Sequence, residues 1–137
     1  MKTITICGKE YKLECNALTY IKYKTFFKQG IIGDIQKLQE YLIKQELITK
    51  QVEEKDISEE EKISIIAKYM NQYVDDFIIA ITRIAWILIY TADKNVVEYE
   101  KWLEGIKNFK IDEDWIVEVA ECAVNCFCWW RIISRNE

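Results

Sequence analysis

The side chains best suited to chemistry are five cysteines: Cys7, Cys15, Cys122, Cys126 and Cys128. Cysteine thiolates bind zinc and act as nucleophiles. Cys122 and Cys126 are spaced to share one face of a helix, and Cys7 and Cys15 could complete a set of four ligands, but the spacing is not that of a zinc ribbon. Both helical cysteines fall in an apolar seam, where cysteine behaves as a small hydrophobic residue. We therefore expect no metal site and place Cys122 and Cys126 in the core.

Two compact acid clusters, Asp75–Asp76 and Asp112–Asp114, are the candidates for general acid–base catalysis. Neighbouring residues of a helix do not face each other, and acids near a helix start are favoured by the helix dipole, so structural roles are the better interpretation. The chain has no histidine, which excludes Ser-His-Asp, Cys-His and histidine–metal sites. Gly30 and Gly33 are not followed by the Lys-Ser/Thr of a phosphate loop. We expect a protein that is not an enzyme and binds no cofactor.

Arg83 stands inside an apolar stretch of 14 residues, 77–90. A membrane-spanning helix needs about 20 apolar residues, and Asp75, Asp76 and Asp93 flank this stretch closely. We therefore expect a buried helix and no membrane partner. A buried arginine needs a partner, so we expect an acid from another helix to pair with Arg83.

The charges are unevenly distributed along the chain, whose net charge is −4. Residues 1–50 hold nine lysines and five acids, whereas residues 51–137 hold ten basic and 18 acidic residues. The lysines of the first half are scattered and no arginine accompanies them, so we expect no nucleic-acid partner. The opposite-sign halves are compatible with weak self-association into a homo-oligomer. The odd cysteine count, with no apolar signal segment, favours reduced thiols in the cytoplasm.

The first element that the pattern predicts is a β-hairpin over residues 3–15. Polar and apolar residues alternate, and Gly8–Lys9 offers a two-residue turn in which glycine supplies a positive φ. This turn pairs Ile4 with Leu13 on the apolar face. A lone hairpin is marginally stable in water, so we expect this face to pack on helices.

Two helices should follow the hairpin. Asn16 is a plausible N-cap for a helix over about 17–28, with Gly30 as its stop. Asp34 is placed to cap the next helix, which fades near Thr49.

Residues 50–62 are highly charged and lack an apolar face, so we expect a mobile loop that ends in a capping box of Ser58 and Glu61. Beyond it, apolar residues recur with heptad spacing, which predicts either one long helix or two helices broken near Asp75–Asp76. The seam consists of Ile63, Ala67, Met70, Val74, Phe77, Ile81, Ile84 and Leu88.

Two further helices complete the prediction. Asn95 can cap a short one, and Asp112 can cap the last one, from Glu113 to about Ser134. Two adjacent apolar seams cover about half of this last helix, which must bury two faces or offer one to a partner. The candidate partner-binding residues are Phe127, Trp129, Trp130 and Trp102, although such aromatic residues could equally belong to the core. Together the elements predict a mainly α (α+β) fold, an N-terminal β-hairpin packed on a bundle of about five helices, in a single domain over residues 1–137.

The chain also resembles a known family, the phage tail assembly chaperones of long-tailed phages and prophages of Gram-positive bacteria. That family tends to show a short hairpin, a helix start containing threonine, a tyrosine-basic stretch leading to Gly-x-Asp, and a Trp-Leu segment before a final helix. Here the phenylalanines and Gly33-Asp34 are spread further apart than usual, which bears on the helix boundary. The residues that carry the resemblance are 6–13 (ICGKEYKL), 16–19 (NALT), Tyr23-Lys24, Phe26-Phe27, 33–35 (GDI) and 99–103 (YEKWL).

The resemblance implies a non-catalytic role in virion morphogenesis. Such chaperones bind the long helical tape measure protein, help recruit tail tube protein, act in the cytoplasm of the bacterial host and are absent from the finished virion. A surplus of apolar helical face is compatible with capture of another helix. The alternative is a small helical regulatory or inhibitory protein that binds a host or phage partner.

Overall fold

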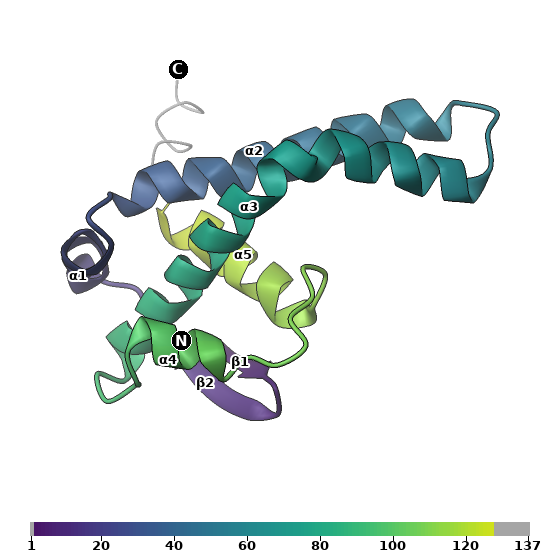
Figure 1. Cartoon of the computed structure of the whole chain (residues 1–137). Helices are drawn as coiled ribbons and strands as arrows, with labels where there is room; N and C mark the ends of the chain where they lie inside the picture. Colours follow the sequence, from purple (N-terminus) through teal and green to yellow (C-terminus); the bar gives the residue numbers. More distant parts are fainter. Residues whose placement is uncertain (1, 128–137) are drawn as a thin grey trace, which may run out of the picture.

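The computed structural model describes residues 2–127 and shows an N-terminal hairpin followed by five helices within that range (Figure 1). This confirms the mainly α (α+β) fold. The elements are β1 (Lys2–Ile6), β2 (Lys9–Leu13), α1 (Ala17–Phe27), α2 (Ile31–Glu53), α3 (Glu59–Ala92), α4 (Tyr99–Glu104) and α5 (Asp114–Phe127).

The hairpin turns one residue earlier than its sequence suggested. Its turn is Cys7–Gly8, not Gly8–Lys9, with φ of 51° and 80° at the two positions. A type I′ turn needs positive φ at both central positions and favours glycine at the second, which explains why the turn is formed by Cys7–Gly8. Ile4 therefore pairs with Tyr11 and not with Leu13. The register moves by two residues, so the predicted apolar face is preserved and both Ile4 and Leu13 are buried.

Helix α1 begins and ends about where it was predicted, but its C-terminal cap is a different residue. The side chain of Asn16 accepts a hydrogen bond from the backbone, and Thr19 Oγ1 accepts one from the Asn16 N–H at 3.1 Å. The helix ends at Lys28, whose left-handed backbone lets its N–H donate to the Lys24 carbonyl. Gly30 is thus not the stop of α1; it precedes α2 in an extended conformation.

The charged segment 50–62 is largely helical, so the prediction of a mobile loop there was wrong. Helix α2 continues past Thr49 to Glu53, and only residues 54–58 connect it to α3. Val52, in the last turn of α2, is only 2% exposed, and lysine and glutamate are themselves good helix formers. Ser58 caps α3 by accepting a hydrogen bond from the Glu61 N–H at 3.2 Å.

Helix α3 is a single helix of 34 residues with no break at Asp75–Asp76. Both aspartates are exposed, so their charges do not have to be buried at the helix centre. Figure 1 shows its N-terminal half running beside the C-terminal half of α2 as an arm that extends away from the other elements. Among the elements that the structure describes, α2 is the one that runs along α3 in this arm, and Ile63, at the start of the predicted seam, remains 66% exposed.

The C-terminal half of α3 is the centre of the fold, as its uniformly apolar sequence predicted. The other helices and the hairpin pack around it, and the Glu14 N–H of the hairpin donates to the Leu88 carbonyl at 3.2 Å. Within residues 2–127, no helix combines the length and apolar character needed to traverse a bilayer. The buried side chains of this segment are Phe77, Ala80, Ile81, Thr82, Ile84, Ala85, Trp86, Ile87, Leu88, Ile89 and Thr91.

The last two helices begin later than predicted. Helix α4 starts after Glu98, because Asn95 lies in a turn where its N–H donates to Asp93 Oδ1 at 2.9 Å. Helix α5 starts at Asp114, and Asp112 belongs to the turn before it, so Asp112 is not the cap. The predicted end near Ser134 falls outside the described residues.

Candidate functional site

Three of the cysteines lie near one another where α1 begins and α5 ends. The Sγ atoms of Cys122 and Cys126 are 3.9 Å apart, and both thiols lie near enough to Cys15 to affect its pKa. Burial and the neighbouring thiols raise the pKa of Cys15 to about 12 and that of Cys122 to about 11, so both stay protonated at neutral pH. Cys126 is exposed and not a core residue, because it lies on the last described turn of α5. No group of three potential metal ligands is close enough to hold an ion in the described part of the chain.

The acid clusters do not gather around a common centre. Asp75 and Asp76 are exposed in the middle of α3. Glu113 accepts a hydrogen bond from the Trp115 indole at 2.5 Å, which fixes the start of α5. Asp112 is exposed and is one of the residues that line an apolar groove.

Arg83 has the partner that its position required. Its Nη1 lies 3.8 Å from Oδ2 of Asp34 on α2, and its guanidinium stacks over the ring of Phe27. Asp34 is only 2% exposed and also accepts a hydrogen bond from the phenol of Tyr23. Burial and this hydrogen bond raise the pKa of Tyr23 far above its usual value. Asp34 is therefore not a helix cap but the centre of a polar cluster that ties α1, α2 and α3 together.

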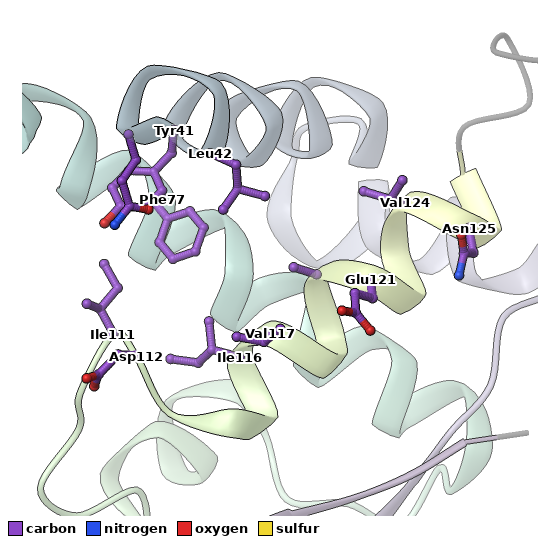
Figure 2. A pocket seen from close by; sticks show the side chains of 12 residues that line it. Tyr41, Leu42, Phe77, Ile111, Asp112, Ile116, Val117, Glu121, Val124 and Asn125 are labelled. Atoms are coloured by element: carbon purple, nitrogen blue, oxygen red, sulfur yellow. The ribbon is translucent and has the colours of Figure 1, made fainter. Parts of the chain in front are cut away.

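An apolar groove of about 570 Å³ lies between α2 and α5, and we call it the α2–α5 groove (Figure 2). Phe77 forms part of it and stacks on Tyr41 with ring centroids 4.2 Å apart. Most of its lining is apolar, as is typical of a binding cleft. It is lined by Tyr41, Leu42, Gln45, Phe77, Ile111, Asp112, Ile116, Val117, Ala120, Glu121, Val124 and Asn125.

The α5 side of the groove is one stripe of that helix. Its lining residues recur in pairs four residues apart, from Ile116 to Asn125. Ile116 is buried against the core, whereas Val117 is 52% exposed. On the opposite side, Leu42 of α2 is 42% exposed, so apolar surface on both sides lies open to solvent.

The residues predicted to bind a partner are not brought together here. Trp102 is 3% exposed and packs edge-on against Trp115, so it belongs to the core and not to a docking surface. Phe127 is the last residue of α5, and Trp129 and Trp130 lie outside the described residues. Of the two alternatives predicted for the last helix, two buried faces or one buried and one offered to a partner, the exposure of Val117 on the groove side of α5 is compatible with the second.

The sequence pattern did not single out Leu42, Val117 and Val124. Val117 and Val124 are seven residues apart and each follows an apolar residue of the same helix, Ile116 and Ala123, and this spacing is the sequence feature that could have indicated them. Neither a protein-family model nor a curated protein nor a solved structure matches the chain. The functional argument therefore starts from the α2–α5 groove.

Proposed function

We propose that the protein is a tail assembly chaperone that binds an apolar helical segment of a phage tape measure protein. In this proposal it also helps to recruit tail tube subunits and catalyses no reaction. The single observation that supports it best is the α2–α5 groove, with apolar side chains open to solvent on both sides. The identity of the partner rests on the resemblance of the sequence to this family.

The groove has the form of a helix-in-groove binding site. In this mode an amphipathic helix places anchors at positions i, i+3 or i+4, and i+7 into an apolar cleft between helices. Full burial of one aliphatic anchor is worth about 1.5–3 kcal/mol before the entropy of association is subtracted. A few anchors seated around Leu42 and Val117 would therefore hold a helix that is otherwise prone to aggregate.

The proposal places the protein in the cytoplasm of the bacterial host during assembly and leaves it out of the finished virion. The free thiols of Cys7, Cys15, Cys122 and Cys126 are consistent with a reducing compartment. The absence of histidine supports the non-catalytic part of the proposal, since common acid–base and nucleophilic sites use it.

The direct test is co-expression of the full chain with a tape measure protein from the same genome, followed by gel filtration. We expect a soluble complex that Val117→Glu disrupts, because a buried carboxylate would face the apolar anchors. The matched control is Val97→Glu, because Val97 is 53% exposed and lies outside the groove. A tape measure protein that stays insoluble and unbound would contradict the proposal and favour the regulatory alternative.

A further inference from the structure

We infer that the α2–α5 groove selects an amphipathic helix whose apolar stripe is flanked by lysine or arginine. This inference rests on the proposed function, because it takes the groove as the site where a helix is captured. It adds the charge of that helix, which the proposed function leaves open.

The length of the groove suits a helix. Its α5 side runs from Ile116 to Asn125, which corresponds to about 14 Å at the rise of an α-helix. Three anchors of a partner helix, from i to i+7, extend over about 10.5 Å and fit within that length. Figure 2 shows Leu42 of α2 and Val124 of α5 on opposite sides of the groove, where they would contact the two flanks of such a stripe.

The charge of the groove is negative. Asp112 and Glu121 are the two charged residues in its lining, and no lysine or arginine lines it within the described chain. Both are exposed, and neither takes part in an ion pair within residues 2–127. The described helix α5 also carries Asp114 and Glu118 and no basic residue.

Unpaired carboxylates beside an apolar cleft favour a partner with cations beside its apolar stripe. Exposed ion pairs are individually weak, and two of them correspond to about a fivefold difference in Kd, which is ~1 kcal/mol. The preference should weaken with salt, because the pairs are solvent-exposed.

The test uses two labelled synthetic helices with the same leucine stripe, one flanked by lysines and the other by glutamates. Fluorescence anisotropy with the full chain should give at least a fivefold lower Kd for the lysine peptide at low salt, and a smaller difference in 0.5 M salt. Val117→Glu should abolish binding of both peptides, and circular dichroism should confirm that the variant is folded. Equal affinities, or binding that survives Val117→Glu, would overturn the inference.

A charge exchange makes the test specific to the groove. The double variant Asp112→Lys/Glu121→Lys should prefer the glutamate peptide. The double variant Glu10→Lys/Asp56→Lys changes the net charge equally at exposed sites outside the groove and should still prefer the lysine peptide. If both double variants change preference alike, net charge and not the groove decides, and the inference fails.

The outcomes also separate this inference from the proposed function. If tape measure protein co-purifies while both peptides bind equally, the charge preference is refuted and the chaperone function stands. If the lysine peptide is preferred while tape measure protein is not retained, the groove specificity stands and the assigned partner is wrong. A dimer in solution that Val117→Glu dissociates would instead show that a second copy occupies the groove, which overturns the inference.

Discussion

The polar cluster around Asp34 makes a sharp prediction about stability. Asp34→Ala removes the acceptor of the Tyr23 hydrogen bond and the carboxylate beside Arg83 and Lys37. Removing one partner of a buried ion pair costs about 3–5 kcal/mol, because the other charge is left without compensation. The side chain of Arg83 keeps 25% exposure and can reach some water, so we expect the lower end, about 3 kcal/mol.

The assay is urea unfolding followed by circular dichroism at 222 nm. The slope of the unfolding free energy against urea concentration should be the same for all variants, which checks that the transition stays two-state. Tyr23→Phe removes only the hydrogen bond and should cost about 1 kcal/mol. The matched control is Asp75→Ala, because Asp75 is exposed on α3 and should change stability by less than about 0.5 kcal/mol. The loss of unfolding free energy should therefore be largest for Asp34→Ala, smaller for Tyr23→Phe and smallest for Asp75→Ala.

A cost below about 1 kcal/mol for Asp34→Ala would refute this reasoning. It would mean that Arg83 finds adequate solvation without Asp34, so the cluster does not tie α1, α2 and α3 together. A double variant with Arg83→Met adds a second criterion. If the two residues are coupled, the double variant should be less destabilised than the sum of the single variants.

Three further predictions concern the arm, the hairpin and alkaline pH. Met70→Ala should cost about 2–3 kcal/mol in urea unfolding and Ile63→Ala about 0.5 or less, because Met70 is 3% exposed and Ile63 is 66% exposed; equal costs would contradict the structure of the arm. Gly8→Ala should cost about 1 kcal/mol in the same assay, because φ is 80° at Gly8, and an unchanged midpoint would argue against the type I′ turn. The raised pKa values of Cys15 (to about 12) and Cys122 (to about 11) contribute stability below the unfolded thiol pKa near 9, and this should be lost as pH rises from about 9 to 12. A Cys15→Ala/Cys122→Ala variant should show a shallower decline in its urea midpoint over that range, and an identical decline would contradict the prediction.

The sequence predicted the elements better than their ends. The hairpin, the Asn16 cap and the long α3 follow from local patterns that the structure keeps. The polarity of segment 50–62 predicts a loop, whereas the structure is largely helical there, because lysine and glutamate favour helix and Val52 is buried in the last turn of α2. Polarity alone therefore does not distinguish a charged helix from a loop.

Of the polar cluster, the sequence predicted that Arg83 needs an acidic partner but did not predict that this partner is Asp34. An arginine inside an apolar stretch needs an acidic partner. The local sequence does not identify that partner, because Asp34 is 49 positions away from Arg83 and lies on another helix. Asp34 looked like a helix cap because aspartate favours that position. Its burial depends on Tyr23 and Arg83 arriving from α1 and α3, which no local pattern encodes.

The groove exists because α5 does not cover all of the apolar surface beside it. Helix α2 is 23 residues long and runs beside α3 along the arm. The described α5 has only 14 residues and packs on α2, α3 and β1. Apolar side chains at positions 42 and 117 remain exposed where α5 and α2 face each other. Polar residues at both positions would leave the core intact and improve solubility, so a fold selected for stability alone has no need of this surface. Under the proposed function a partner helix covers this surface, and the unpaired Asp112 and Glu121 beside it set the charge that we expect on that helix.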